Sequence, residues 1–299
     1  MRIIEIMDKI ANMQAFAAVG HSGSFAEAAR KLNIANSVVS KRIKDLEDFL
    51  GTQLFLRTTR KVTLTDTGQR YLEQAQRILD DLTEVESGIR HQSQKPVGTI
   101  RLTAPLSFGL QTLAPALVSY LDKCPDVSIK TYMTDRRVDL VAEGYDLAIR
   151  IGALEDSSLV AKKLSRGRRV VCATPAYLKK YGTPQTPADL KDHNCLSYTN
   201  LAEGKAWPFM IDKKKIWQKV SGNFFSDTGD ILHQTALAGG GITLLPTFII
   251  AESLKTKKLQ IVLEDYEEDN FDIYAVYQQT RHVPIKIRTL IDHLGQALG

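Results

Sequence analysis

The spacing of apolar residues changes near residue 98 of this 299-residue chain, and that change limits the possible folds most. Before residue 92, apart from a short strand-like stretch at 53–64, apolar residues recur every three or four positions, as in amphipathic helices. After Gly98, strand-like runs alternate with helical ones, which is typical of α/β domains with largely parallel sheets. The polar segment 92–98 between them contains Pro96 and Gly98. We therefore expect an N-terminal helical part and a larger α/β part, joined at this segment.

Two short helices with a tight turn are predicted near the N-terminus. Ser24 precedes the first run and Glu27 follows three residues later, as in a capping box. The second helix is expected to begin at 36–37 and to end at Gly51, after a turn at 33–35. In a helix-turn-helix, the second helix enters the major groove of DNA with its N-terminal residues. With Ser24 at the start of the first helix, the residues offered to DNA would be Asn36, Ser37, Ser40, Lys41 and Lys44. An ordinary helical hairpin with a solvated charged face has the same pattern.

A basic hairpin follows these helices. Two short strands, at 53–56 and 61–64, flank a turn, and residues 21–65 carry eight basic and four acidic side chains. A hairpin of this kind can contact phosphates or the minor groove as a wing. Its candidate DNA contacts are Arg57, Thr59, Arg60 and Lys61. The hairpin and the two helices together favour DNA binding over a plain helical hairpin.

A long helix is predicted after the hairpin, capped by residues 65–68. Its apolar residues follow a spacing of three and four, close to that of a coiled coil. A linker follows this helix, so the sequence assigns it no core of its own. We therefore expect a second copy of the chain to cover the stripe formed by Leu72, Ala75, Leu79, Leu82 and Ile89.

Four motifs in this region occur in order and at matched spacing. They are Gly23-Ser24-Phe25-x-x-Ala28-Ala29-x-x-Leu32, Val39-Ser40-x-x-Ile43-x-x-Leu46-Glu47, Leu50-Gly51-x-x-Leu54-Phe55-x-Arg57 and Leu64-Thr65-x-x-Gly68. This pattern resembles the LysR-type transcriptional regulators. Residues 135–152, 157–161 and 172–178 resemble the CrgA-like branch of that family, so the resemblance spans the chain. Many members read Ser-Gln-Pro where this chain reads Ala35-Asn36-Ser37, so no operator sequence is carried over. Met7 stands where the family usually starts, so residues 1–6 are expected to reflect either the choice of an upstream start codon or a tag-like extension.

The resemblance implies an all-α winged helix-turn-helix domain at 7–65, a linker (dimerisation) helix at 66–93 and an effector-binding domain at 97–299. The last of these would resemble periplasmic binding proteins. Its lobe one would be 97–166 with 268–299, its lobe two 168–266, and the crossing strands would lie near 164–169 and 265–272. The implied function is sequence-specific DNA binding that a small-molecule effector modulates.

The same resemblance implies the partners. They are double-stranded promoter or operator DNA, a small polar or anionic metabolite and a homodimer or higher homo-oligomer, with RNA polymerase as a further candidate. No cofactor, metal or membrane is expected, and the chain is expected to be cytoplasmic.

The effector would bind in the cleft between the two lobes, where helix N-termini and strand ends point backbone N–H groups at a ligand. Ser107 and Thr228 lie near predicted helix starts that follow strands, and Asp227 is predicted to begin the second of these helices. The candidate lining residues are Pro105, Ser107, Phe108, Arg150, Gly152, Thr199, Asn200, Asp227 and Thr228. Plain N-caps would explain the Ser and Asp positions equally simply.

Two further alternatives concern this cleft. Arg150 would either clamp a carboxylate of the ligand or pair with Asp135 or Asp146. Trp207 and Phe209 would either close the cleft or pack in a core.

Other classes of protein find little support. There is no apolar run long enough to span a membrane, no secretory signal and no matched catalytic motif, and the six histidines are scattered. Three cysteines form neither a disulfide framework nor a metal-ligand spacing, which indicates reducing cytosol. The competing hypotheses are a ligand-blind architectural DNA-binding protein, a solute-binding protein of a transport system and, last, an enzyme.

Overall fold

The computed structural model describes residues 2–57, 62–89, 95–154, 158–200, 206–279 and 283–299. The chain divides into two compact units, 1–94 and 95–299. In the described part of the chain, no helix is both long and apolar enough to cross a membrane.

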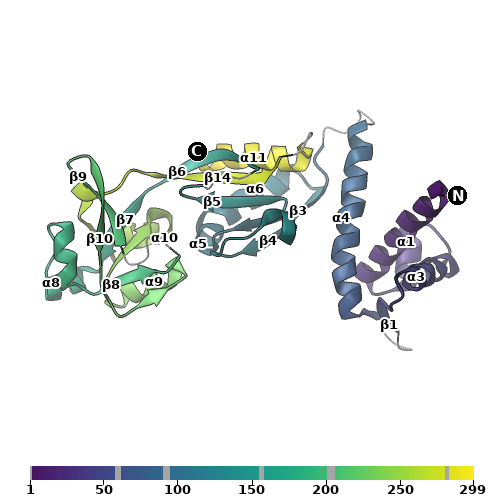
Figure 1. Cartoon of the computed structure of the whole chain (residues 1–299), viewed down its shortest axis with the longest axis horizontal. Coiled ribbons are helices and arrows are strands. Elements are labelled where there is room, and N and C mark those ends of the chain that lie inside the picture. The colour runs from purple at the N-terminus through teal and green to yellow at the C-terminus, as the bar shows by residue number, and fades with distance from the viewer. Residues whose placement is uncertain (1, 58–61, 90–94, 155–157, 201–205, 280–282) are drawn as a thin grey trace. The chain divides into compact units, whose positions relative to one another are not determined.

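The N-terminal unit is a small helical bundle with a two-stranded hairpin (Figure 1). Its core contains Phe16 of the first helix, Val39, Ile43 and Leu46 of the third, and Leu54 before the hairpin. The strands β1 and β2 are antiparallel, with Arg57 opposite Val62. The elements are α1 (Arg2–Ser22), α2 (Phe25–Leu32), α3 (Asn36–Leu50), β1 (Phe55–Arg57), β2 (Val62–Leu64) and α4 (Asp66–Ile89).

The predicted ends of α2 and α3 are confirmed by their caps. The Ser24 hydroxyl accepts a hydrogen bond from the Glu27 N–H at 3.3 Å, and α2 ends at Asn33 with φ of 54°. Helix α3 begins at Asn36 and ends before Gly51, whose φ of 66° is the left-handed conformation that glycine adopts without strain.

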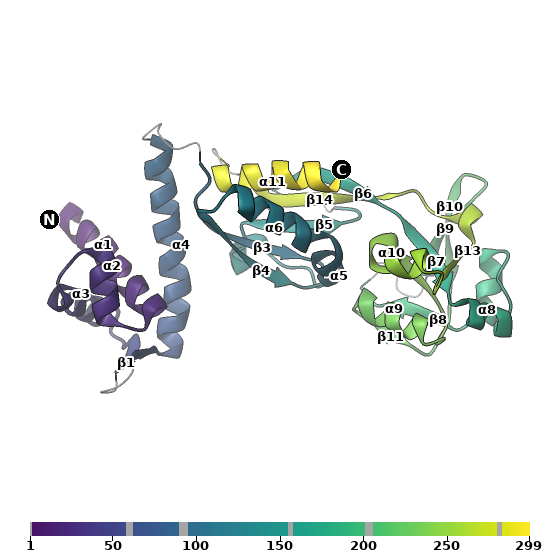
Figure 2. The ribbon, with the colours of Figure 1, turned by 180° about the vertical axis from the view of Figure 1, so that it is seen from behind.

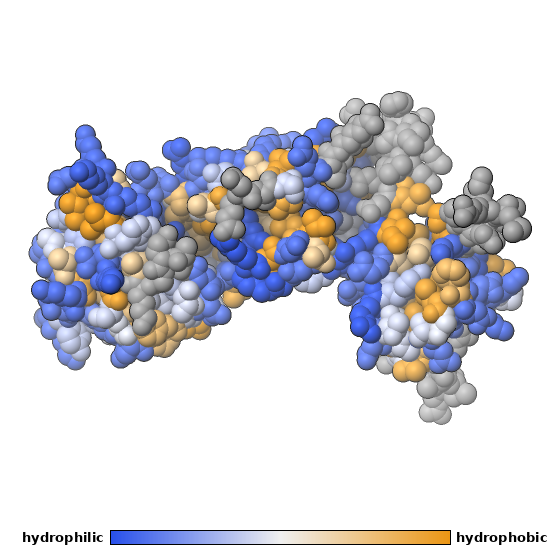
Figure 3. Space-filling view, in the orientation of Figure 1, coloured by the Kyte–Doolittle hydropathy of each residue, from blue (hydrophilic) through white to orange (hydrophobic). Residues whose placement is uncertain are grey.

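Helix α4 differs from the sequence expectation. Leu72, Ala75 and Leu79 are buried inside the unit itself, because the first half of α4 packs on α1, where Leu72 lies against Gly20. The prediction that this stripe has no core of its own is therefore wrong for these three residues. Leu82 is half-buried, and the side chain of Ile89 lies outside the described residues. Figure 3 shows hydrophobic surface along the middle of α4, where Ile78 is 50% exposed.

The second unit consists of two α/β lobes, each built on a five-stranded sheet. In lobe one the strand order is β4-β3-β5-β14-β6, and α6 and α11 cover one face of the sheet (Figure 2). The short α7 packs on the other face with Val138, Ala148 and Val276. The elements are β3 (Gly98–Ala104), α5 (Leu106–Phe108), a π-helical turn (Gly109–Leu113), α6 (Ala114–Lys123), β4 (Val127–Met133), α7 (Leu140–Glu143), β5 (Leu147–Ile151), β6 (Leu159–Gly167), β14 (Phe271–Gln278) and α11 (Ile285–Leu298).

Lobe two has the strand order β11-β8-β12-β7-β13. Alternate residues of β7 face two different cores: Val171 and Ala173 one, Val170 and Cys172 the other. The elements are β7 (Arg169–Ala173), α8 (Pro175–Tyr181), a 3₁₀ turn (Pro187–Asp192), β8 (Cys195–Tyr198), β9 (Ala206–Ile211), β10 (Lys214–Lys219), β11 (Phe225–Ser226), α9 (Gly229–Leu237), β12 (Ile242–Pro246), α10 (Thr247–Lys255), β13 (Gln260–Val262) and a 3₁₀ turn (Glu264–Tyr266).

Two details of the predicted α/β region are corrected, and one open alternative is decided. Both sheets are mixed rather than largely parallel, because β14 runs antiparallel to β5 and β6, and β7 runs antiparallel to β12 and β13. Helix α9 begins at Gly229, so Asp227 does not start it. Trp207 and Phe209 are buried in the core of lobe two and do not close the cleft.

Two neighbouring chain segments connect the lobes, one after β6 and one before β14 (Figure 2). Ion pairs join them. The Arg168 guanidinium lies 2.7 Å from a carboxylate oxygen of Glu264 and 2.7 Å from one of Glu267, and these bonds raise the pKa of Arg168. Lys163 pairs with Asp272 at 2.5 Å. The two crossings are thus held to each other by charge as well as by backbone pairing.

Candidate functional site

The exposed face of α3 is the first candidate site. Asn36, Ser37, Lys41 and Lys44 are exposed and Ser40 is half-buried, while Val39, Ile43 and Leu46 on the opposite face are buried. Residues spaced three or four apart share one side of a helix, so the five predicted contacts form a single surface. The hydroxyl of Ser24, by contrast, caps α2.

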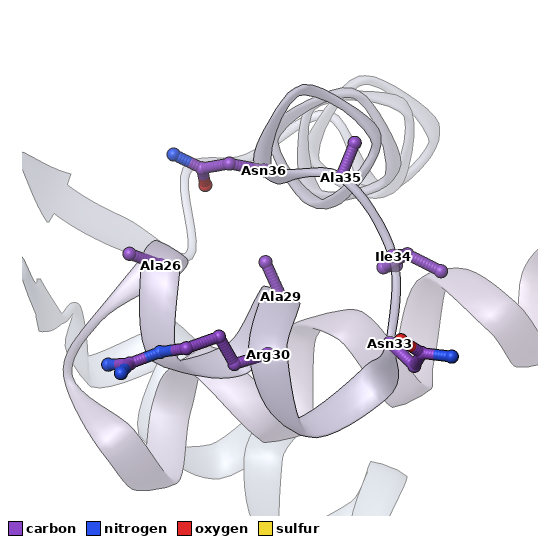
Figure 4. Close-up of a pocket in the computed structure, with 7 residues that line it drawn as sticks. All are labelled: Ala26, Ala29, Arg30, Asn33, Ile34, Ala35 and Asn36. Atoms are coloured by element: carbon purple, nitrogen blue, oxygen red, sulfur yellow. The ribbon is translucent and has the colours of Figure 1, made fainter.

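The start of α3 lies open beside α2. Ala35, at the N-cap, makes no side-chain hydrogen bond, and the first turn carries no acidic residue, so its backbone N–H groups and helix dipole favour an anion such as a phosphate. A hollow of about 570 Å³ lies at this turn. Figure 4 shows that Arg30 and Asn36 extend to the same side. Sequence reasoning missed Arg30, although it precedes the turn by one helical turn.

The start of the wing is fastened to α3. A carboxylate oxygen of Glu47 accepts hydrogen bonds from the backbone N–H groups of Leu54 at 2.8 Å and Phe55 at 3.2 Å. The Thr65 hydroxyl accepts a hydrogen bond from the Gly68 N–H at 2.9 Å and so caps α4. Of the predicted wing contacts, Thr59, Arg60, Lys61 and the side chain of Arg57 lie outside the described residues.

The second candidate site is a cleft of about 630 Å³ lined by both lobes. Much of its wall is apolar, with Phe108, Val138 and Leu159 from lobe one and Leu244 and Phe248 from lobe two. Phe108 and Phe248 meet edge to face, with ring centroids 5.3 Å apart. The polar and charged lining side chains are Ser107, Asp135, Arg137, Arg150, Arg169, Tyr198 and Asn200.

One part of the cleft lining is acidic. Asp135 accepts a hydrogen bond from the Leu106 N–H at 3.1 Å, at the start of α5. Burial raises the pKa of Asp135, and the negative charges of Asp227 and Asp230 raise it further. Burial, with the charge of Asp135, also raises the pKa of Tyr198 to about 12. The carboxyl group therefore sits where its own charge is disfavoured.

A hydrogen bond joins the two lobes beside this carboxylate. The Ser107 hydroxyl, on α5 of lobe one, donates to a carboxylate oxygen of Asp230 on α9 of lobe two at 2.6 Å. The expectation that Ser107 presents a helix start to an anion is thus corrected, because a carboxylate of the protein already holds that hydroxyl.

Arg150 lies in a different part of the cleft. Its guanidinium donates to the neutral carbonyl of Val138 at 3.0 Å. The alternative partners are engaged elsewhere: Asp146 accepts from the Arg101 N–H at 2.7 Å, and Asp135 accepts from Leu106. Burial lowers the pKa of Arg150 and the charge of Arg137 lowers it further, whereas the negative charge of Glu143, which is itself paired with Arg136, opposes this shift. A half-buried cation whose hydrogen-bond partner is a neutral carbonyl can bind an anionic ligand.

The predicted effector residues divide into two groups. Pro105, Ser107, Phe108, Arg150 and Asn200 line the cleft. The other four predicted residues do not line the cleft: Gly152, Thr199, Asp227 and Thr228. The backbone N–H groups of Gly152 and Thr199 donate to the backbone carbonyls of Asp272 and Ser226, respectively. The Thr228 hydroxyl donates to the Asp227 carboxylate.

Asp135, Arg137 and Tyr198 also line the cleft and were not among the predicted effector residues. All three lie at or just after strand ends, which is the signal that would have found them. Within the described residues, no three His, Cys, Asp or Glu side chains gather as a metal site.

Comparison with known proteins identifies both units. Residues 10–69 match the family model of the bacterial regulatory helix-turn-helix protein, lysR family, and residues 93–299 match the LysR substrate binding domain. An HTH-type transcriptional regulator of Haemophilus influenzae is 37% identical over 94% of this chain and 98% of its own length. The HTH-type transcriptional regulator CrgA of Neisseria meningitidis is 34% identical over 95% of each.

A solved structure agrees with these sequence matches. The structure of CrgA from Neisseria meningitidis aligns with a TM-score of 0.64 at 32% identity, over 97% of this chain and 98% of that one. The predicted resemblance and fold class are therefore confirmed. The chain belongs to the LysR family of helix-turn-helix transcriptional regulators, with an N-terminal DNA-binding unit and a two-lobed effector-binding unit.

Proposed function

We propose that this regulator binds operator DNA through the exposed face of α3 and the wing, and that an organic acid in the interlobe cleft changes this binding. The observation that carries the proposal is the half-buried Arg150 in a cleft lined from both lobes. A ligand that touches both lobes has different affinities for different lobe angles, and only such a difference can shift a conformational equilibrium.

The DNA contacts proposed are Asn36, Ser37, Ser40, Lys41 and Lys44, with Arg30 added at the hollow. The predicted wing contacts, Arg57, Thr59, Arg60 and Lys61, belong to the same proposal. We further propose a homodimer or larger homo-oligomer, because a two-fold operator needs two recognition helices. Its place of action is the cytoplasm, where operator DNA lies, and RNA polymerase is the partner through which it would act.

Lys41→Ala tests the DNA surface. The full chain first selects its preferred DNA from a random-sequence pool, and affinity is then measured over a range of salt concentrations. Loss of one phosphate contact lowers the affinity and reduces the log–log salt slope by about one. Lys130→Ala, which removes an equal charge from exposed β4, leaves both unchanged. An unaltered affinity and slope for Lys41→Ala would place DNA elsewhere.

Thermal unfolding tests the cleft. A panel of organic acids is screened on the full chain and on Arg150→Gln. A ligand at a hundred times its dissociation constant stabilises the unit that binds it by roughly 2.7 kcal/mol, if the unfolded chain does not bind it. Acids whose stabilisation is the same in both proteins would remove Arg150 from the site.

A further inference from the structure

We infer, on the basis of the proposed effector function, that the cleft takes a zwitterion. It would be an organic molecule with an apolar body, a carboxylate held by Arg150 and a protonated amine held by Asp135. The inference rests on the cavity itself, which presents charges of opposite sign at two places and an apolar wall between the lobes.

Among the described residues, no cationic side chain is a hydrogen-bond partner of Asp135. The Asp135 carboxylate accepts hydrogen bonds from the Leu106 N–H and from the Tyr198 hydroxyl, and both donors are neutral. A carboxylate has about four acceptor positions, so capacity remains for a ligand. Asp227 and Asp230 stand close enough to repel its charge, and Asp230 is held by the Ser107 hydroxyl. An ammonium group bound here would cancel repulsion that a neutral or anionic group would leave in place.

The part of the cleft around Arg150 is positively charged and suits a carboxylate of the ligand. Arg150 gives a hydrogen bond to a neutral carbonyl, and Arg137 adds positive charge near it, while Glu143 is paired with Arg136. Asp135 and Arg150 thus engage different partners, and each offers its charge to the cavity. A carboxylate at Arg150 can accept two parallel hydrogen bonds, which also fixes the orientation of the ligand.

The wall between these charges selects the body of the ligand. Leu140, Ile151, Leu244, Ile249 and Val276 line the cleft. A polar body such as a sugar would leave its hydroxyl groups without partners against these side chains, which is unfavourable. An aliphatic or aromatic chain carrying the two charged groups suits all three parts of the lining.

The test uses matched small molecules on the full chain, measured by isothermal titration. The probes are straight-chain ω-amino acids from 4-aminobutanoate to 8-aminooctanoate, each compared with the carboxylic acid and the amine of equal length. We expect at least one amino acid to bind about tenfold or more tightly than both of its single-charge analogues, because both charge-assisted contacts are then made.

Variants assign the two ends. Asp135→Asn is expected to lower the affinity for the best amino acid about tenfold and to leave that of the matching carboxylic acid equal or higher. Arg150→Gln weakens both the amino acid and the carboxylic acid, and Asp122→Asn, on the exposed side of α6, changes neither. If Asp135→Asn does not fold, the comparison of the three probe classes on the unaltered chain decides alone.

The outcomes separate this inference from the proposed function. If carboxylic acids bind as tightly as the amino acids, and Arg150→Gln lowers their affinity, the inference of a zwitterionic ligand is wrong and the proposed organic-acid effector stands. Amines that bind as tightly as the amino acids would also overturn it. Binding of no probe of any class would count against both.

Discussion

A single missing side chain lets the wing and α4 approach each other. A Cβ atom at Gly68 would lie 2.1 Å from the backbone oxygen of Leu54, a contact that no rotamer change relieves. Leu54 cannot move away easily, because its N–H is bonded to Glu47 and its side chain is in the core. The glycine of the Leu64-Thr65-x-x-Gly68 motif is therefore required by packing, and the same approach brings Thr65 into place as the cap of α4.

Gly68→Ala is expected to destabilise the DNA-binding unit by about 1–3 kcal/mol, the usual cost of overpacking. Denaturant unfolding of the full chain measures it. The matched change is Gly295→Ala on α11, where an added Cβ meets nothing within 4 Å. Since alanine has the higher helix propensity, that change should stabilise its unit by roughly 0.5–1 kcal/mol. Equal effects at the two glycines would contradict this account of the wing.

At the scale of an element, α4 has two different apolar faces. Leu72, Ala75 and Leu79 are used by the core of their own unit, with Leu79 only 9% exposed. Ile78, one residue away, is 50% exposed, and Leu82 is half-buried. Among the described apolar side chains of α4, those of Ile78 and Leu82 remain available for the proposed dimer contact, because Leu72, Ala75 and Leu79 are covered within the unit.

Replacing both Ile78 and Leu82 with Asp should yield folded monomers, since the charges fall on the face proposed to meet a second copy. Sedimentation gives the oligomeric state and circular dichroism gives the helix content. Leu79→Ala is the contrasting variant. This change should lower the free energy of unfolding of the DNA-binding unit by about 2–5 kcal/mol, the usual cost of truncating a buried leucine. The folded protein should keep its oligomeric state. A double variant that sediments like the unaltered chain would rule out this face of α4.

At the scale of the whole molecule, the DNA-binding and effector-binding units each have their own hydrophobic core. Units of this kind unfold as separate cooperative transitions when few contacts cross between them. The effector unit carries both tryptophans, on the paired strands β9 and β10. Trp207 is 1% exposed in the core of lobe two, whereas Trp217 is 41% exposed.

Trp207→Ala should lower the stability of the effector unit by about 3–5 kcal/mol, the usual cost of emptying a buried aromatic site. Calorimetry of the full chain should show one transition shifted and the DNA-binding transition unchanged. Trp217→Ala, the matched exposed change, should shift neither by more than about 0.5 kcal/mol. A shift of both transitions by Trp207→Ala would mean that the units unfold together.

What the sequence determined by itself was local. The caps at Ser24 and Gly51, the limits of α3 and the alternation of strands and helices in the effector unit follow from residue types within a few positions, because backbone preferences act over that range. The motifs that indicated the family can be read from the sequence alone, although the contact between Gly68 and Leu54 that explains one of them forms only in the folded unit. The short strand β13 was not predicted, since its pairing partner β7 lies far away in sequence.

Only the tertiary structure decided which surfaces meet. The period of α4 shows that one face is apolar, but α1 decides that Leu72 and Leu79 are covered within the unit. The cleft depends in the same way on two lobes that close on each other. Ser107 meets Asp230, and Asp135 stands near Asp227, through contacts between segments far apart in sequence. Spacing along the chain carries no record of such pairings, because they result from the packing of the folded lobes.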